Sequence, residues 1–331
     1  MQLNRLAIVL LAAVYSGPSC AQSSSSPRVV VIETRDNSFY NSAVDGFQHG
    51  LKIRGYDTRE RLNFVVIALT GSETKDTKTV RGQLHDPSNL ILTLGTDATR
   101  IVAGEKPHTS VLFGMILDPV RLGLVQSIEN PRGVFTGSTI LVSPGKQIEA
   151  LIEADPQVKR VGVLFTDGDK TSIDMLDRAR QDAAKLGAEI VAIPVTEEKN
   201  SSTNALDQLA GKVDAIWVIP DPASTGPQAF TGALQFSKDH KVPILGSSSG
   251  MVHAGALLAL SANLFDLGDM MAEMAVPIID GSSKPADVRV RGPRKTQLSV
   301  NLDAARDLGI KIPDSMLHLA DEVVDSKAKD R

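Results

Sequence analysis

Short apolar runs alternate along this chain with longer amphipathic segments, and the clearest example lies between residues 89 and 119. Residues 90–94 form an apolar run that suits a strand buried on both faces, and a helix is expected from there to residue 103. Residues 110–113 supply the next buried strand. Two strands joined by a crossover helix lie parallel, and ligands collect beyond the carboxyl ends of such strands. Residues 95–99 and 115–119 are therefore expected to line one cleft.

The same alternation predicts one α/β unit in the first half of the chain. The expected strands are residues 28–34, 63–68, 90–94, 110–113 and 134–138. The expected helices are residues 42–54, 75–84, 96–103 and 118–129, the last with Asp118 as its cap and Pro119 at its first position. Residues 139–147 carry Pro144 and Gly145 between two regular regions and are predicted to cross to a second lobe.

A second α/β unit begins with a strand at residues 160–165. Further strands are expected at 189–195, 214–219, 242–245, 256–261 and 297–301, and helices at 172–186, 204–210, 227–240, 265–279 and 302–308. Met270, Met271 and Met274 are expected to fill the core beneath the helix 265–279. Counted up to residue 261, the second unit has five strands like the first, and two such successive units describe either a bilobed binding protein or a two-domain enzyme.

The predicted fold is α/β, with two Rossmann-like lobes built on parallel sheets. The N-terminal lobe is expected to comprise residues 27–140 and 264–285, and the C-terminal lobe residues 141–263 and 286–320. Residues 281–294 contain two prolines and are predicted to cross back between the lobes. The charged residues 321–331 are predicted to be a flexible tail.

Residues 1–21 have the pattern of a signal peptide. A short basic start precedes an apolar run at residues 6–15, which is too short to span a bilayer, and small residues allow cleavage after Ala21. We therefore expect export to the periplasm. Cys20, the only cysteine, stands either where a bacterial lipoprotein carries its acylated cysteine or in a segment discarded with the signal.

Composition and motifs argue against several classes of function. A net charge of −4 without a dense basic cluster gives no reason to expect nucleic acid as a partner. No Gly-rich phosphate loop follows the first strand, and the six histidines are scattered. We therefore expect no cofactor, no metal site and no enzymatic activity.

One enzyme-like motif is present, at Gly246-Ser247-Ser248-Ser249-Gly250, which matches the nucleophile elbow GxSxG of hydrolases. A serine hydrolase using Ser248 would need a later acid and then a histidine, and only His253 and His318 follow. The interpretation that we favour is a loop of hydroxyl and N–H groups that binds polar ligand atoms.

Candidate ligand-binding residues follow from the topology, because each loop at the carboxyl end of a strand faces the cleft. In the first lobe these residues are Phe39, Tyr40, Thr96, Asp97, Ala98 and Asp118, and in the second they are Lys170, Thr171, Asp221, Ser248 and Ser249. The two aromatic rings could enclose a flat ligand, or they could pack beneath the first loop. Asp118 could instead be a helix cap, and Lys170 could hold an anion or remain solvated.

Several stretches taken together resemble the extracytoplasmic substrate-binding proteins of ABC importers, of the type whose better-known members bind aromatic amino acids. The resemblance covers about residues 29–319 and rests on residues 45–47, 55–56, 118–125, 161–164, 209–216, 251–257, 301–310 and 312–313. It implies a type I periplasmic-binding fold, with a hinge of several crossings between lobes that close on a ligand. It also implies delivery of that ligand to a membrane permease with a cytoplasmic ATPase.

Two departures from that family concern the ligand. The loop at Ser247–Ser249 lacks the acidic residues that can neutralise an ammonium group, and Asp97 stands where a small residue or proline is frequent. An amino acid, a neutral aromatic compound or a cationic ligand therefore remain alternatives. The favoured function is solute binding for an ABC importer, and the alternatives are a sensory binding protein that signals to a membrane receptor and a serine hydrolase.

Overall fold

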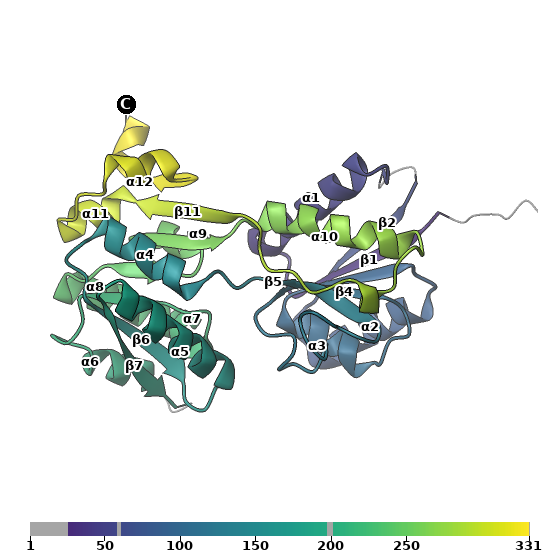
Figure 1. Ribbon diagram of the computed structural model, residues 1–331, viewed down its shortest axis with the longest axis horizontal. Coiled ribbons are helices and arrows are strands. Elements are labelled where there is room, and N and C mark those ends of the chain that lie inside the picture. The colour runs from purple at the N-terminus through teal and green to yellow at the C-terminus, as the bar shows by residue number, and fades with distance from the viewer. Residues whose placement is uncertain (1–25, 58–60, 197–200, 331) are drawn as a thin grey trace, which may run out of the picture.

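The computed structural model describes residues 26–57, 61–196 and 201–330. Within these residues the chain forms two α/β lobes that lie side by side and are joined by extended segments (Figure 1). We call the part built on strands β1–β5 the N-terminal lobe and the part built on strands β6–β12 the C-terminal lobe. The predicted signal peptide and Cys20 lie outside the described residues.

The sheet of the N-terminal lobe contains five parallel strands in the order β2-β1-β3-β4-β5. These strands are β1 (Arg28–Glu33), β2 (Asn63–Ala68), β3 (Leu90–Leu94), β4 (Val111–Ile116) and β5 (Phe135–Thr139). Every residue of β3 and β4 is buried, as expected for strands with helices on both faces. The five strands predicted for this lobe are confirmed, with small shifts at their ends.

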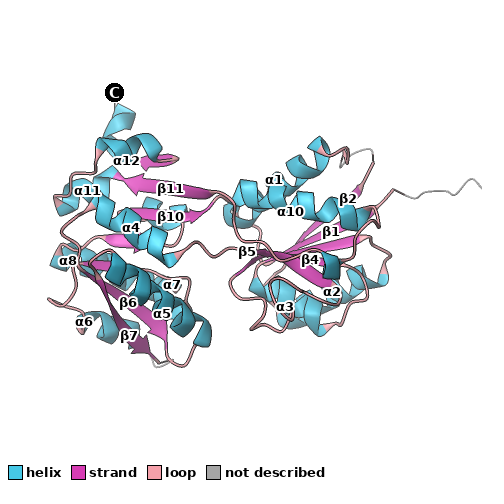
Figure 2. Ribbon diagram, viewed as in Figure 1, coloured by secondary structure: helices cyan, strands magenta, loops and turns pink. Residues whose placement is uncertain are grey.

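Helices cover both faces of this sheet (Figure 2). α1 (Ser38–Ile53) and α10 (Leu264–Ile279) share one hydrophobic cluster with the sheet, and α2 (Glu73–His85) and α3 (Thr96–Gly104) pack on the other face. α10 follows the second sheet in sequence but packs on the first. Its methionines Met270, Met271 and Met274 are at most 2% exposed, which confirms that they fill the core.

Residues 118–129 do not form the predicted helix. The Asp118 carboxylate accepts a hydrogen bond from the Arg121 N–H at 2.9 Å, so it does cap a turn. Gly123 then adopts a φ of +69°, a left-handed conformation that ends the turn before a helix can extend. The chain continues through further turns to β5.

The sheet of the C-terminal lobe contains seven strands in the order β12-β11-β10-β9-β8-β6-β7. These strands are β6 (Arg160–Thr166), β7 (Glu189–Val195), β8 (Ala215–Trp217), β9 (Ile244–Gly246), β10 (Leu258–Ala262), β11 (Thr296–Asn301) and β12 (Glu322–Val324). Neighbouring strands are parallel except β10 and β11, which run antiparallel. The sheet therefore departs from the predicted parallel arrangement at this pair, because β11 enters directly from a crossing segment rather than from a crossover helix of the same lobe.

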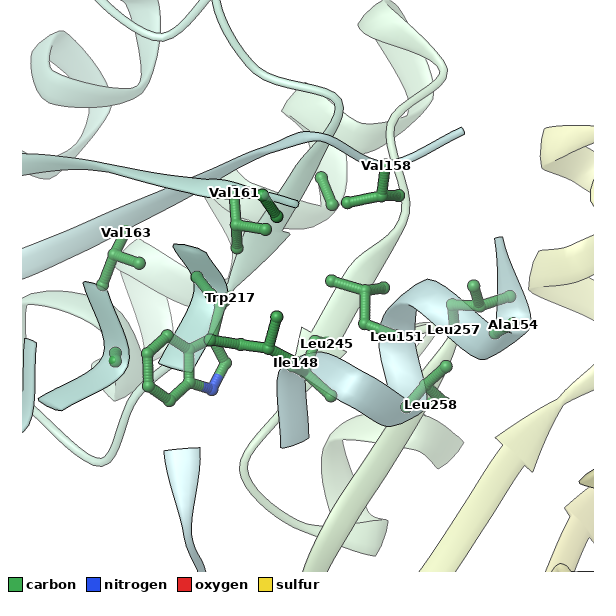
Figure 3. Packing of buried hydrophobic residues seen from close by; sticks show 14 of the residues in the cluster. Ile148, Leu151, Ala154, Val158, Val161, Val163, Trp217, Leu245, Leu257 and Leu258 are labelled. Carbon is green, nitrogen blue, oxygen red and sulfur yellow. The ribbon is translucent and has the colours of Figure 1, made fainter. Parts of the chain in front are cut away.

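The helices of this lobe are α4 (Pro144–Ala154), α5 (Lys170–Lys185), α6 (Ser201–Asp207), α7 (Pro222–Thr225), α8 (Pro227–His240), α9 (Ser249–His253), α11 (Leu302–Leu308) and α12 (Asp314–Leu319). Trp217 is fully buried and lies among apolar side chains that include Ile148 of α4 and Val163 of β6 (Figure 3). Trp217 therefore belongs to the core of this lobe. α4 lies where the sequence predicts only a crossing segment, because Pro144 begins a helix, a position at which proline is favoured.

The predicted flexible tail forms regular structure. β12 pairs in parallel with β11, and the following 3₁₀ helix (Ser326–Asp330) begins where the Ser326 N–H donates to an Asp303 carboxylate oxygen at 3.0 Å. Val323 and Val324 are β-branched and suit an edge strand, a signal that the surrounding charged residues conceal.

The chain passes between the lobes after β5, after β10 and before β11. Two of these crossings are joined by a parallel bridge between Ser138 and Arg291. The crossing that contains Arg291 follows a short 3₁₀ helix (Pro285–Asp287), and the remaining crossing leads from β10 directly into α10. The lobes are therefore connected by several neighbouring segments rather than by one linker.

Candidate functional site

A cavity of about 540 Å³ lies between the two lobes, at the carboxyl ends of their strands. The N-terminal lobe contributes Thr34, Phe39, Tyr40, Gly95, Thr96, Asp97, Met115 and Leu117. The crossing after β5 contributes residues 140–142, and the C-terminal lobe contributes Gln147, Met175, Pro220, Pro222, Thr225, Ser247, Ser248, Ser249 and Met251. Ser261, Ala262, Leu264 and Gln297 complete the wall near the other crossings. We call this space the inter-lobe cavity.

Two aromatic rings form one wall of the inter-lobe cavity. The centroids of Phe39 and Tyr40 are 5.3 Å apart and their planes meet at 83°, an edge-to-face pair. They begin α1, whose Asn37 cap accepts a hydrogen bond from the Tyr40 N–H at 3.2 Å. Burial raises the pKa of Tyr40, and a hydrogen bond with Thr34 opposes this effect only in part, so the phenol is neutral at pH 7.

Gly95 allows the aromatic wall to approach β3. It adopts a φ of +90°, and a Cβ atom there would lie 2.6 Å from Thr34 Oγ1 and 2.8 Å from the Tyr40 hydroxyl. Only glycine fits both the backbone conformation and the space. The Thr34 hydroxyl donates to Leu94 O at 2.9 Å and accepts from the Ala98 N–H at 3.2 Å. Ala98 is fully buried and does not line the cavity.

The opposite wall presents three successive hydroxyl groups at the start of α9. Ser247, Ser248 and Ser249 all line the cavity, as predicted for a loop that follows strand β9. Ser248 caps α9 with extended backbone angles, φ −154° and ψ 159°. Its hydroxyl has no hydrogen-bond partner among the described residues, so it is free to meet a ligand.

The geometry around Ser248 does not assemble a nucleophile with a base. His253 Nε2 lies 2.6 Å from Glu322 Oε1, on the side of β12, rather than beside the Ser248 hydroxyl. His318 lies on α12, and its Nδ1 contacts the Asp314 carbonyl oxygen at 2.6 Å. A serine nucleophile needs a base within hydrogen-bond reach, and no described residue supplies one to Ser248.

Asp221 is buried and does not reach the inter-lobe cavity. Its carboxylate accepts hydrogen bonds from the Thr166 N–H at 3.0 Å, the Thr166 hydroxyl at 2.7 Å, the Ser172 hydroxyl at 2.5 Å and the Ala223 N–H at 2.7 Å. These bonds hold together the loops that follow β6 and β8. Asp221 was predicted to contact the ligand. In the structure its carboxylate instead points into the lobe and binds neighbouring loops.

Asp118 and Thr171 line a second cavity of about 410 Å³ beside the crossing segments, which we call the hinge cavity. Leu117, Leu141 and Met175 belong to the walls of both cavities. Arg121 links the lobes there, because its guanidinium pairs with Asp118 in one lobe and with Asp174 of α5 in the other. Lys170 is exposed at the start of α5 and lines neither cavity.

The floor of the inter-lobe cavity is apolar, and the sequence predicted only part of it. It consists of Met115, Leu117, Met175 and the crossing residues 140–142. Met115 adopts a φ of +62°, which is uncommon for a residue with a side chain, at an irregularity in the pairing of β4 with β5. Residues 115–119 were expected at the cleft because they follow a strand, whereas the segments that contain Met175 and residues 140–142 gave no such sign.

Glu33 ends β1 and is only 3% exposed, and its Oε2 atom has no hydrogen-bond partner among the described residues. Burial raises the pKa of Glu33, and the nearby Asp36 raises it further. A carboxyl group with a raised pKa in the folded state favours folding when protonated, and this contribution is lost as the pH rises through that pKa.

We therefore expect the Glu33→Gln variant to gain stability relative to the wild type as the pH rises above about 4, the ordinary range of a glutamate carboxyl. Urea unfolding of both proteins between acidic and neutral pH would measure the difference in their free energies of unfolding. A difference that shrinks with rising pH would contradict this interpretation of Glu33.

Two further features of the described residues bear on function. No group of three or more histidine, cysteine, aspartate or glutamate side chains among them is arranged to hold a metal ion. No helix in the described ranges is both long enough and apolar enough to cross a membrane.

Two α/β lobes joined by several crossings, with their strand ends facing one another, define a type I periplasmic-binding fold. The chain belongs to the ABC transporter substrate binding protein family, whose model matches residues 29–324. The family membership expected from the sequence is thereby confirmed.

Relatives with known structures or names support this assignment. A tyrosine-binding protein of Clostridioides difficile (strain R20291) is 24% identical over 274 residues, which cover 82% of this chain and 77% of that protein. A domain from Streptococcus pneumonia in complex with L-Trp has a TM-score of 0.74 and 25% identity, and covers 91% of this chain and 100% of its own. A ligand-free, open substrate binding protein with adhesive properties from Clostridium difficile has a TM-score of 0.77 and 23% identity, with coverage of 90% and 99%.

Proposed function

We propose that this protein is the extracytoplasmic solute-binding component of an ABC importer and that it binds a small organic ligand in the inter-lobe cavity. The observation that carries the proposal is that both lobes and the crossing segments contribute to one cavity of about 540 Å³, within the size range of small-molecule sites. Family membership supports the transport context. The occupied protein would present both lobes to a permease with a cytoplasmic ATPase.

Closure of the lobes would supply the affinity. A ligand that touches both walls removes water from the apolar floor at Met115 and Met175 and stabilises the closed arrangement over the open one. Leu117, Leu141 and Met175 separate the inter-lobe cavity from the hinge cavity, so movement at the crossings would change the shapes of both.

The walls favour a ligand with an aromatic or apolar body. Phe39 and Tyr40 offer an edge-to-face pair beside the apolar floor, and Ser247–Ser249 offer hydroxyl groups to polar atoms at the other end. The names of relatives, a tyrosine-binding protein and a domain in complex with L-Trp, are consistent with an aromatic group in this position.

The site of action would be the periplasm. The N-terminal segment has the pattern of an export signal, and acylation of Cys20 would hold the protein at the membrane surface where a permease lies. Mass spectrometry of the protein purified from membranes would show an acylated N-terminal cysteine if Cys20 is retained, and an unmodified N-terminus beyond it if the segment is removed.

Ligand binding is expected to raise the melting temperature of the purified protein, because a ligand that binds only the folded state stabilises it. A panel of small aromatic compounds in a thermal-shift assay would identify ligands, and titration calorimetry would measure their affinities. We expect Phe39→Ala and Ser248→Ala, one from each lobe, to weaken binding by at least about tenfold.

Phe265→Ala provides the matched control for the aromatic wall. Phe265 is exposed to a similar extent as Phe39, at 42% against 37%, but does not line the cavity. The control is therefore expected to keep the affinity of the wild type. Equal affinities of wild type, Phe39→Ala and Ser248→Ala would place the ligand outside the inter-lobe cavity.

A further inference from the structure

The charged groups around the inter-lobe cavity are unevenly distributed. Among the described residues that line it, Asp97 is the only acidic one, and none is a lysine, arginine or histidine. The polar remainder consists of hydroxyl groups and the amides of Gln147 and Gln297. The wall therefore offers a carboxylate to a ligand cation but offers no cation to a ligand carboxylate.

The neutral groups of the wall can donate hydrogen bonds, but they carry no positive charge. A ligand carboxylate needs several donors, yet the Ala98 N–H at the start of α3 already donates to Thr34 Oγ1 at 3.2 Å. The Gln147 amide donates one of its two N–H groups to Leu260 O at 2.8 Å, so one N–H group and the carbonyl oxygen remain. Asp97 is the second residue of α3, so its negative charge lies beside the N–H groups that remain there.

Cationic side chains lie on adjoining surfaces, in the hinge cavity and in a third, small cavity. Arg35 and Arg100 line a small cavity of about 180 Å³ that shares Thr34 and Asp97 with the inter-lobe cavity. Arg100 is 3.9 Å from Asp97, and both side chains are more than half exposed, so water screens the pair and leaves the carboxylate available. Neither arginine lines the inter-lobe cavity.

We propose that the inter-lobe cavity selects small monocations with an aromatic body, that is aromatic amines, over zwitterionic amino acids that carry the same ring. Phe39 and Tyr40 would contact the ring, and Asp97 would pair with the ammonium group. A zwitterion brings the same ammonium group but must also bury a carboxylate against a wall without cations, which opposes binding. This inference rests on the proposed function and specifies the class of its ligand.

Ligands that share one ring and differ in their charged groups test the inference. Titration calorimetry of the full mature protein would compare tyramine with L-tyrosine, tryptamine with L-tryptophan, and 4-ethylphenol as a neutral compound with the tyramine ring. We expect each amine to bind at least about tenfold more tightly than its amino acid, with 4-ethylphenol weaker than tyramine.

Asp97→Asn is expected to weaken tyramine binding by at least about tenfold and to leave 4-ethylphenol unchanged, because only the amine uses the charge. Asp36→Asn is the matched control, since Asp36 is an exposed aspartate in the loop after β1 that does not line the cavity. It is expected to bind tyramine as the wild type does.

The possible results separate the inference from the proposed function. Amino acids that bind as tightly as their amines would overturn the inference and keep the proposed function, and would point to Arg35 as the cation that meets the carboxylate. Unchanged tyramine affinity in Asp97→Asn would also overturn it. No binding by any of these compounds would overturn the inference together with the aromatic ligand of the proposed function.

Discussion

Replacement of Gly46 or Gly268 by alanine is expected to destabilise the protein by at least about 3 kcal/mol. A Cβ atom at Gly46 would lie 1.9 Å from the Phe265 carbonyl oxygen, and one at Gly268 would lie 2.1 Å from the Ala43 carbonyl oxygen. Both clashing atoms belong to the backbone, which cannot avoid the clash by a change of rotamer as a side chain can. α1 and α10 would have to separate, which would open the hydrophobic cluster that they share with the sheet.

Gly82→Ala in α2 is the matched control for these two substitutions. Gly82 also lies inside a helix, but no atom lies within 4 Å of the position that its Cβ would take. Alanine is favoured over glycine in a helix, so this variant should gain about 0.5–1 kcal/mol. Urea unfolding of the three variants would measure the differences. A Gly46→Ala variant as stable as Gly82→Ala would show that the two helices separate easily.

The packing of α1 on α10 illustrates what the sequence could not predict. Each helix was expected at nearly its observed position, because apolar residues recur with the helical period and a glycine or polar residue follows at the end. Gly46 and Gly268 are more than 200 positions apart, and their pairing leaves no local pattern. A lone glycine inside a helical segment indicates a close contact without identifying the partner.

Some predictions of secondary structure were wrong because they depended on patterns only a few residues long. Asp118 and Pro119 correctly mark the start of a turn, but the left-handed Gly123 ends it. Pro144 and Gly145 suggested a loop although Pro144 begins α4. The strand β12 is three residues long within a charged segment, and its existence depends on pairing with β11 rather than on its own pattern.

The ends of the strands explain which candidate residues lie at the inter-lobe cavity, while their role in binding stays a prediction. Phe39, Tyr40, Thr96, Asp97, Ser248 and Ser249 line the inter-lobe cavity because they follow parallel strands. The position of a loop at the carboxyl end of a strand predicts that the loop lies near the cleft, but it does not predict which way each side chain points. Ala98 packs into the core against the sheet, and Lys170 is exposed to solvent. Asp221 also follows a strand, but its carboxylate is directed inward to neighbouring loops.

Asp221→Ala is expected to lower the free energy of unfolding by at least about 3 kcal/mol. The carboxylate is 1% exposed and accepts bonds from Thr166, Ser172 and Ala223. Alanine would leave these buried donors without an acceptor, and each such group costs about 1–3 kcal/mol. Asp221→Asn keeps one acceptor oxygen and should be affected less, which urea unfolding would measure.

The same variants separate a structural role of Asp221 from a role in binding. Since the side chain does not line the inter-lobe cavity, folded Asp221→Asn should bind the ligand with the affinity of the wild type while unfolding at lower urea concentration. Asp177→Ala, an exposed aspartate on α5, should change neither property. Loss of ligand affinity in Asp221→Asn at full stability would instead mean that the carboxylate reaches the ligand, which would require the loops after β6 and β8 to rearrange when the lobes close.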